Sequence, residues 1–197
     1  MDVQVPEYDV QESMELRSED AVLLVVDMQK DFVHEDGSLY NPEAEETVPV
    51  LRDLIETTRS SGVPVWYTKD THTENDPEFE VWGEHCLEDS WGWEIVDPLK
   101  PDDDDRVFLK SRYDGFYGTE LDHQLNLADR DTLIITGTVA NICVHYTAAS
   151  AGLRYYDVIH PVDAISALTE FDYHAALRQA TFLFQAELVK SSGLALN

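Results

Sequence analysis

Basic residues are scarce in this sequence. It has 13 lysines and arginines against 40 aspartates and glutamates, so its formal net charge is −27. Because a surface this acidic repels phosphate groups, we expect neither nucleic acid nor an anionic membrane as a partner. The acidic residues are spread along the whole chain rather than gathered in a tail. This distribution favours a halophilic protein whose charge is screened by molar salt.

Cysteines and long apolar runs are also few. The two cysteines, Cys86 and Cys143, lie in separate segments and offer no disulfide framework, which is typical of a reducing compartment. No apolar run is long enough to span a bilayer. Residues 1–17 have neither the basic region nor the apolar run of a signal peptide. These absences predict a cytoplasmic protein that acts on a small molecule in a pocket.

Strand and helix patterns alternate along the chain. We expect strands over residues 21–27, 63–68, 106–110, 132–136, 157–162 and 186–189. We expect helices over residues 48–61, 118–127, 143–151 and 170–187, and a long functional loop over 73–98. Such alternation predicts an α/β fold, with three layers (α/β/α) and a mostly parallel central sheet. The length suits a single domain over residues 19–197 after an acidic N-terminal lead-in over 1–18.

Reactive side chains gather at the predicted strand ends. Five of them lie at or just past the carboxyl end of a strand: Asp27, Asp70, His72, Lys110 and Cys143. Because ligands bind beyond the carboxyl ends of parallel strands, all five side chains would face one crevice. One such residue has an ordinary structural explanation, but the five together indicate a functional site.

Cys143 is the residue best placed to act as a nucleophile. It opens an apolar, alanine-rich helix directly after a strand and a Gly/Thr turn. The positive end of a helix dipole favours the thiolate, and free N–H groups of the first turn can hold an oxyanion. With Asp27 as proton acceptor and Lys110 as nearby cation, a cysteine hydrolase could cleave an amide through a thioester. Taken singly, these residues also fit a buried apolar side chain, a turn cap and a surface lysine.

A second cluster follows the strand over 63–68. Asp70, His72 and His85, with Glu78 between the two histidines, offer two imidazoles and one or two carboxylates. This ligand set suits Zn²⁺, Mn²⁺ or Fe²⁺ and leaves coordination positions open for water or substrate. His85 also fits an ordinary loop histidine. We interpret the adjacent cysteine as a packing residue rather than a ligand.

Three motifs point to a known family. Residues 27–32 read Asp-Met-Gln-Lys-Asp-Phe, and residues 110–119 run from a lysine to Phe-Tyr-Gly-Thr. Residues 136–144 carry a Gly-Thr-Val-Ala turn before the cysteine. Over residues 21–189 the chain resembles the isochorismatase-like cysteine hydrolases, and the nicotinamidases most of all.

The resemblance implies a role for each residue at the proposed reaction centre. Asp27 would be the catalytic base, Lys110 the catalytic lysine and Cys143 the nucleophile. The peptide bond between Thr138 and Val139 would be cis, and the backbone N–H groups of Val139 and Cys143 would form the oxyanion hole.

The same resemblance implies a metal cofactor. Asp70, His72 and His85 fall on the positions where nicotinamidases hold a divalent metal, and Glu78 matches a fourth ligand found in part of the family. The expected metal is zinc, with manganese or iron as alternatives, and it would bind the pyridine nitrogen of the substrate. Three aromatic side chains would line the pocket around the ring: Phe32, Trp82 and Tyr113.

The first function that the resemblance implies is hydrolysis of nicotinamide to nicotinate and ammonia, a step of NAD salvage. The alternative is a carbamoyl or ureido amidase, of the N-carbamoylsarcosine or ureidoacrylate type, and these relatives generally lack the metal cluster. Isochorismatase itself cleaves a vinyl ether without needing a thiol, so Cys143 argues against it. A catalytically silent binding module would have no use for intact Asp27 and Lys110. Relatives are often dimers or larger, so the resemblance also implies a homo-oligomer.

Overall fold

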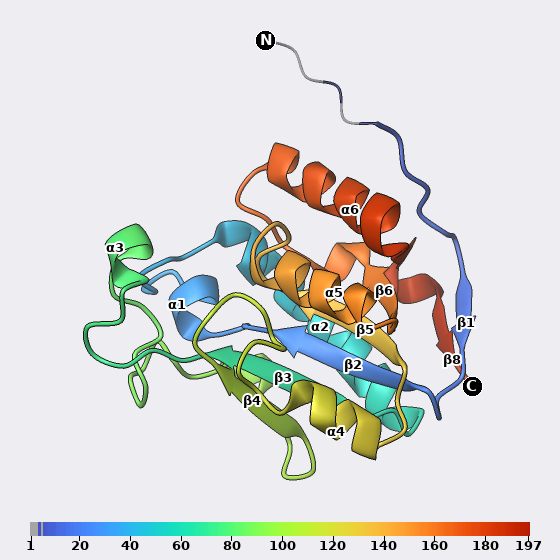
Figure 1. Ribbon diagram of the computed structural model, residues 1–197, viewed down its shortest axis with the longest axis horizontal. Coiled ribbons are helices and arrows are strands. Elements are labelled where there is room, and N and C mark those ends of the chain that lie inside the picture. The colour runs from blue at the N-terminus through green and yellow to red at the C-terminus, as the bar shows by residue number, and fades with distance from the viewer. Residues whose placement is uncertain (1–3, 5) are drawn as a thin grey trace.

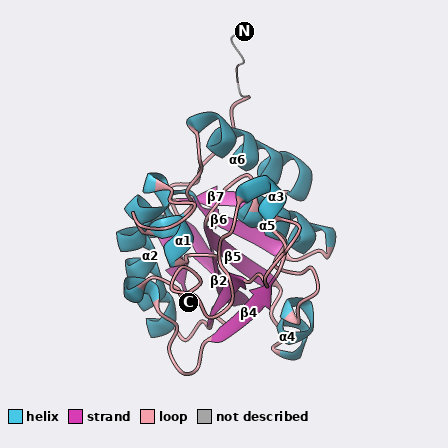
Figure 2. Cartoon of the chain, turned by 90° about the vertical axis from the view of Figure 1, so that its left-hand side faces the viewer, coloured by secondary structure: helices cyan, strands magenta, loops and turns pink. Residues whose placement is uncertain are grey.

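A six-stranded parallel sheet forms the centre of the molecule. The computed structural model describes residue 4 and residues 6–197 of the chain. The strands lie in the order β4-β3-β2-β5-β6-β7, and each neighbouring pair is parallel (Figures 1 and 2). Their bounds are β2 Ala21–Val26, β3 Val65–Asp70, β4 Arg106–Lys110, β5 Thr132–Gly137, β6 Asp157–Pro161 and β7 Glu187–Val189. All the strands predicted from the sequence are therefore present.

Helices cover both faces of the sheet (Figure 2). Alternate residues of β2 point to opposite faces: Leu23 and Val25 pack in one apolar cluster with α2, whereas Val22 and Leu24 pack in another with α4, α5 and α6. The helix bounds are α1 Lys30–Val33, α2 Pro42–Ser60, α3 Phe79–Trp82, α4 Leu121–Leu127, α5 Cys143–Leu153 and α6 Glu170–Phe184. This arrangement confirms the predicted three-layer α/β/α fold. Among the described helices, none has the length and apolar character needed to cross a membrane.

Several predicted helix bounds were wrong, and α4 begins at Leu121 rather than at residue 118. The first long helix begins at Pro42 rather than Val48, because the Asn41 side chain accepts a hydrogen bond from the Glu43 N–H and caps it. Its first turns are acidic and largely exposed, so they carry little apolar pattern. The last helix ends at Phe184, three residues early, because Gln185 adopts the left-handed conformation (φ 56°) and turns the chain toward β7.

The segment 73–98 contains more regular structure than the predicted loop. It holds the short helix α3 and the start of a 3-10 turn, η1 Asp97–Leu99. The four-residue helix α1, which follows β2, was also missed. These elements are too short to show an apolar period, although Val33 of α1 and Leu99 of η1 are buried in the apolar core.

A small two-stranded sheet joins segments from opposite ends of the sequence. Strand β1, Met14–Leu16, pairs in parallel with β8, Leu194–Leu196. Strand β1 lies within the N-terminal lead-in predicted over residues 1–18, and Met14 is buried. Residues 1–3 and 5 of that lead-in lie outside the described residues, and the domain boundary at residue 19 stays a prediction.

His160 is a buried histidine that holds β6 against β5. Its Nδ1 lies 2.9 Å from the carbonyl oxygen of Ile135, and because a carbonyl only accepts, Nδ1 carries the proton. Burial lowers the pKa of His160 to about 4. The folded protein therefore keeps this imidazole neutral over a pH range in which the unfolded chain protonates it.

We expect the substitution His160→Gln to reduce the loss of unfolding free energy between pH 7 and pH 4. Below about pH 6.5 the unfolded chain binds a proton that the folded state does not bind until much lower pH, so stability falls as the pH falls. From pH 7 to pH 4 this linkage costs the wild type about 3 kcal/mol, and glutamine, which still donates to Ile135, avoids that cost. Urea unfolding of both proteins at fixed KCl concentration measures the difference. Parallel pH profiles for the two proteins would contradict the assignment.

Candidate active site

The reactive side chains meet where the central strands end. Asp27 directly follows β2, Asp70 ends β3 and Lys110 ends β4. In the register of the sheet, Asp70 lies beside Lys110 on the neighbouring strand. Asp27 adopts a positive φ of 52°, which bends the chain as it leaves the sheet. The parallel topology therefore brings these residues to one edge, as the sequence predicted.

Lys110 is the centre of a buried polar cluster. Its Nζ lies 2.7 Å from Oδ2 of Asp27 and 3.1 Å from Oδ1 of Asp70. The same ammonium donates to Sγ of Cys143 at 3.7 Å. Thr68 donates from Oγ1 to the other oxygen of Asp27 at 2.8 Å. The side chains of Lys110 and Asp27 are fully buried, so this ion pair is shielded from water.

Burial controls which of these groups is charged. It raises the pKa of Asp27 and raises that of the Cys143 thiol well above its ordinary value, although Lys110 opposes both shifts. Burial also disfavours the ammonium of Lys110, but the acidic groups around it raise its pKa well above the usual value. The sequence predicts that the positive end of the helix dipole favours the thiolate. In the structure, burial outweighs that effect, so the start of α5 alone does not supply a thiolate. Transfer of the thiol proton to Asp27 would form the thiolate with no change in net charge.

The turn before Cys143 has the geometry of an anion-binding loop. The peptide bond between Thr138 and Val139 is cis, which confirms the expectation from sequence. Helix α5 begins at Cys143, and the Ala140 N–H donates to the carbonyl of Ser166 at 2.7 Å, which fixes the turn. Among the described residues, the N–H groups of Val139 and Cys143 donate to no protein acceptor. Both N–H groups are therefore available for the oxyanion role, which stays a prediction.

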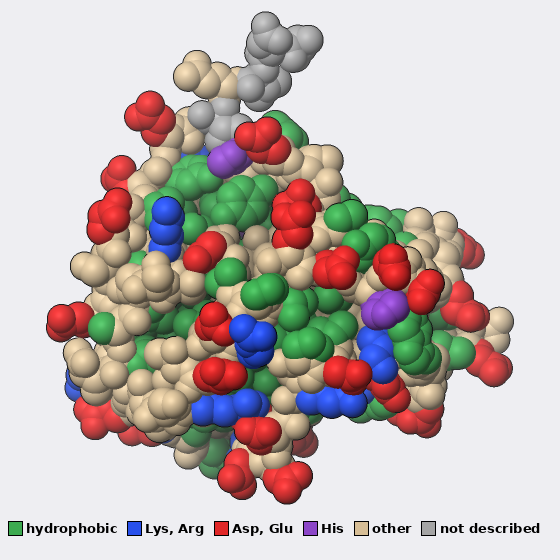
Figure 3. Space-filling view, turned by 180° about the vertical axis from the view of Figure 1, so that it is seen from behind, with side chains coloured by type: hydrophobic (Ala, Val, Ile, Leu, Met, Phe, Trp, Pro, Cys, Tyr) green, Lys and Arg blue, Asp and Glu red, His purple; other side chains and the backbone are tan. Residues whose placement is uncertain are grey.

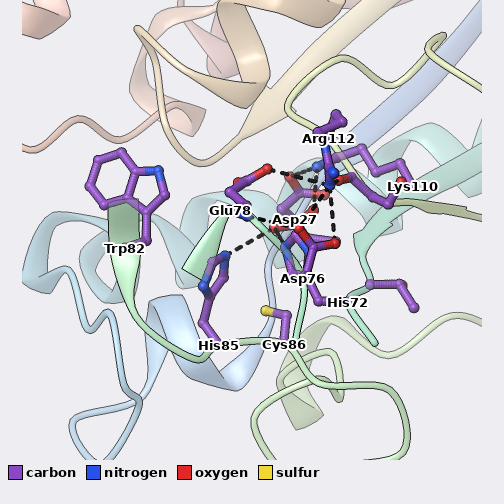
Figure 4. A network of polar contacts seen from close by, with 12 residues as sticks. Asp27, His72, Asp76, Glu78, Trp82, His85, Cys86, Lys110 and Arg112 are labelled. Atoms are coloured by element: carbon purple, nitrogen blue, oxygen red, sulfur yellow. Dashed lines mark hydrogen bonds and ion pairs between the residues drawn. The ribbon is translucent and has the colours of Figure 1, made fainter. Parts of the chain in front are cut away.

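Four predicted metal ligands converge beside this cluster. One atom from each of Asp70, His72, Glu78 and His85 lies within 4.8 Å of the others, and all four residues are buried. Figure 4 labels three of them, His72, Glu78 and His85. Nε2 of His72 lies 3.1 Å and Nε2 of His85 3.5 Å from Oδ2 of Asp70. Nδ1 of His85 lies 2.8 Å from the carbonyl of Gly83, which leaves its Nε2 facing the cluster. This set of nitrogen and oxygen donors fits a divalent transition metal.

Asp70 belongs to both clusters. One of its carboxylate oxygens faces Lys110, and the other faces the two imidazoles. Burial opposes its ionisation, but Lys110 and the imidazoles outweigh burial and hold the pKa of Asp70 well below its usual value. The buried side chain of Gln29 fixes the backbone here, since it accepts from the Asp70 N–H at 2.7 Å and donates to its carbonyl at 2.8 Å. Gln29 lies within the motif over 27–32, but no role was assigned to it from sequence.

A pocket of ≈ 270 Å³ opens above the thiol. Its lining includes Cys143 and the three aromatic residues predicted from sequence, Phe32, Trp82 and Tyr113. Trp82 donates from Nε1 to the Tyr113 hydroxyl at 2.9 Å, so α3 is tied to the segment after β4. The lining also includes residues that sequence analysis missed: Ser38, Leu39, Tyr40, Asn41, Thr138, Ile142 and Leu168. Among the described residues that line this pocket there is no lysine or arginine.

Asp76 and Arg112 are two further polar residues of the site that sequence analysis did not identify. Nδ1 of His72 lies 3.1 Å from Oδ2 of Asp76, and Arg112 donates to both oxygens of that carboxylate at 3.1 Å. Burial disfavours the ionised form, but the Glu78 N–H, His72 and Arg112 outweigh it and lower the pKa of Asp76 to about 2. The only sequence signal was an Asp-Pro pair two residues before Glu78, which is typical of a turn.

Comparison with known proteins identifies the family. Residues 21–191 match the isochorismatase domain. This chain belongs to the isochorismatase family. Enterobactin synthase component B of Escherichia coli (strain K12) is 30% identical over 162 residues, which are 80% of this chain and 56% of that protein. The chain thus spans little more than half the length of this relative.

Two solved structures have the same fold as this chain. N-carbamoylsarcosine amidase from Thermoplasma acidophilum is 40% identical, with a TM-score of 0.81 over 87% of this chain and 96% of that one. The pyrazinamidase/nicotinamidase from Streptococcus mutans UA159 is 25% identical, with a TM-score of 0.81 over 85% and 99% of the two chains. The chain is accordingly an enzyme, a hydrolase of the isochorismatase family.

We expect Lys110→Met to destabilise the fold strongly at pH 7. The substitution leaves two buried carboxylates, Asp27 and Asp70, without their shared cation, which costs about 3–5 kcal/mol. The loss should shrink toward pH 5, because unpaired buried carboxylates have raised pKa values and regain stability when protonated. Urea unfolding followed by circular dichroism measures both effects. The matched variant Lys100→Met, which removes an exposed ion pair with Asp97, should leave the unfolding free energy nearly unchanged.

Proposed function

We propose that this enzyme hydrolyses a small uncharged carboxamide, and that the substrate is nicotinamide, which it converts to nicotinate and ammonia. The observation that carries this proposal is the pocket beside Cys143. It combines an aromatic lining with an adjacent cluster of metal ligands, and its described lining offers no lysine or arginine to hold a substrate carboxylate. Such a pocket favours a flat neutral ring over an anion.

The first half of the proposed reaction forms a thioester. Asp27 accepts the proton of the Cys143 thiol, and the sulfur attacks the carboxamide carbon. The N–H groups of Val139 and Cys143 hold the negative oxygen of the tetrahedral intermediate. The carbon–nitrogen bond then breaks, Asp27 returns the proton to the leaving nitrogen, and ammonia departs. Lys110 lies close enough to both Asp27 and the sulfur to stabilise whichever of them is negative.

The second half restores the thiol. A water molecule gives a proton to Asp27 and attacks the thioester carbon, and the carbon–sulfur bond breaks. The sulfur leaves as a thiolate beside Lys110 and takes the proton back from Asp27. One water molecule is consumed, and the products over both halves are the acid and ammonia. The same carboxylate therefore acts as base and acid in each half, which requires the raised pKa that burial gives it.

Asp70, His72, Glu78 and His85 would hold the metal ion in this proposal. The chemistry that a bound Zn²⁺, Mn²⁺ or Fe²⁺ supplies here is a Lewis acid that can take a pyridine nitrogen as ligand. The neighbouring side chains Phe32 and Trp82 line the same pocket and would contact the faces of the ring. A substrate fixed at its ring nitrogen and by its faces presents its carboxamide to the thiol in a defined orientation.

A carbamoyl or ureido amide is the second candidate substrate. The 40% identity to N-carbamoylsarcosine amidase favours it. N-carbamoylsarcosine and ureidoacrylate both bear a carboxylate, however, and Lys110 is already engaged by two carboxylates of the protein. We place isochorismatase activity last, because a vinyl ether needs no thiol and Cys143 is built into the reaction centre.

The acidic surface leads us to propose a high-salt cytoplasm as the environment of this enzyme. The net charge is −27, and acidic side chains are spread over the face shown in Figure 3 with few basic side chains among them. At about 1 M salt the screening length falls to about 3 Å, so surface carboxylates separated by more than that distance no longer repel each other strongly.

Ammonia release from nicotinamide tests the proposed reaction. With Zn²⁺-loaded protein in molar KCl, we expect turnover of nicotinamide to exceed that of N-carbamoylsarcosine and ureidoacrylate. Cys143→Ala should lower it by at least about 10³-fold, since the nucleophile is lost. The matched variant Cys86→Ala removes the other buried thiol and should retain most of the activity. Turnover of a carbamoyl compound but not of nicotinamide would keep the mechanism and replace the substrate.

The proposed salt requirement predicts a melting temperature that rises with KCl. Between about 0.1 M and about 2 M KCl we expect a continuous increase, because screening removes repulsion among the carboxylates in the folded state. Differential scanning calorimetry measures the shift. Sorbitol at matched osmolality is the control, since it is excluded from the surface without screening charge. A melting temperature that does not change with KCl, or that rises equally with sorbitol, would contradict this proposal.

A further inference from the structure

The carboxylate of Asp76 contacts two of the proposed metal ligands at once (Figure 4). Its Oδ2 lies 3.1 Å from Nδ1 of His72, and its Oδ1 accepts a hydrogen bond of 2.9 Å from the N–H of Glu78. Only 9% of its side chain is exposed, although it lies on a loop. One side chain thus constrains an imidazole and the backbone of a carboxylate ligand.

The contact with His72 favours the tautomer that a bound metal needs. Both nitrogens of His72 face carboxylates: Nδ1 lies 3.1 Å from Oδ2 of Asp76, and Nε2 lies 3.1 Å from Oδ2 of Asp70. A metal bound at Nε2 would leave the imidazole proton on Nδ1, beside the carboxylate of Asp76. A carboxylate partner also makes the ligand nitrogen more basic than a neutral partner does. His85 has the weaker arrangement, because its Nδ1 faces the carbonyl of Gly83.

Arg112 fixes Asp76 in turn. Its guanidinium donates to both oxygens of Asp76 at 3.1 Å and lies 3.8 Å from Oε2 of Glu78. Arg112 lies two residues after Lys110, at the end of β4, whereas Asp76 lies on the segment that carries Glu78 and His85. This ion pair therefore ties the ligand-bearing loop to the strand that supplies the catalytic lysine.

We propose that Asp76 is a positioning residue for a divalent metal. Asp76 holds His72 and Glu78 in the orientation for coordination, and Arg112 holds Asp76 in turn. This inference rests on the proposed metal-dependent function. A purely structural reading of Asp76 is also available, because an aspartate that accepts from the N–H two residues on is an ordinary turn. The two readings differ for Asp76→Asn, which keeps an oxygen for the Glu78 N–H but loses the charge opposite His72.

The test compares Zn²⁺ affinity in the full-length wild type, Asp76→Asn and Asp76→Ala. Competition with a chromophoric chelator gives the dissociation constants, the visible absorption of the Co²⁺ form reports ligand geometry, and the melting temperature of the metal-free protein reports folding. We expect Asp76→Ala to bind Zn²⁺ about 10- to 100-fold more weakly and Asp76→Asn about 10-fold more weakly. The Co²⁺ spectra of both should shift from that of the wild type.

The matched control is Glu80→Gln, which removes an exposed carboxylate from the same segment and should bind Zn²⁺ like the wild type. A metal-free Asp76→Asn protein that melts like the wild type yet binds Zn²⁺ less tightly supports the inference. Equal Zn²⁺ affinity and equal Co²⁺ spectra for the wild type and Asp76→Asn overturn it, while the proposed function stands. A wild type that binds neither ion overturns the metal site and this inference with it, and the ammonia assay then judges the thiol chemistry separately.

Discussion

A single buried ammonium group holds the site together. Lys110 Nζ lies within 3.1 Å of two carboxylates and donates to the thiol, and water reaches none of this ion pair. A lone charge buried this deeply would be expelled or neutralised, so Lys110 and its partners are stable only together. The constraint explains why three strand ends must be in register: a shift of any one strand would leave a charge without its partner.

The sheet fixes this register because its strands are already hydrogen-bonded to each other, whereas loops would have to be ordered separately. Parallel strands bring their carboxyl ends to one edge, and Gln29 ties the backbone of Asp70 to the turn after β2. The pocket and the ligand cluster are then built outward from that rigid edge by loops and by the short helix α3. Helix α3 has no buried residue, and polar contacts such as the hydrogen bond from Trp82 to Tyr113 hold it.

Local sequence patterns are enough to predict the strands and the residues at their ends. Apolar runs predict the strands, and a parallel sheet places Asp27, Lys110 and Cys143 at one edge. The ion pair of Asp76 and Arg112 could not be predicted, because the two residues are 36 positions apart in the chain. They meet only when the loop over 73–98 folds back on β4. The lining residues Tyr40 and Leu168 could not be predicted either, because they join the pocket only through the tertiary fold. The roles of the site residues stay predictions, whereas their proximity is established.

The two oxygens of Asp70 have an evolutionary consequence. One faces Lys110 and the other faces the imidazoles, so a substitution of Asp70 would disturb both clusters. A lineage that abandoned the metal could replace His72 and His85 with little penalty at the thiol. It could not discard Asp70 as freely, since the charge of Lys110 would lose a partner. The retention of an aspartate here is therefore weak evidence that a homologue binds metal, and the two histidines are the diagnostic pair.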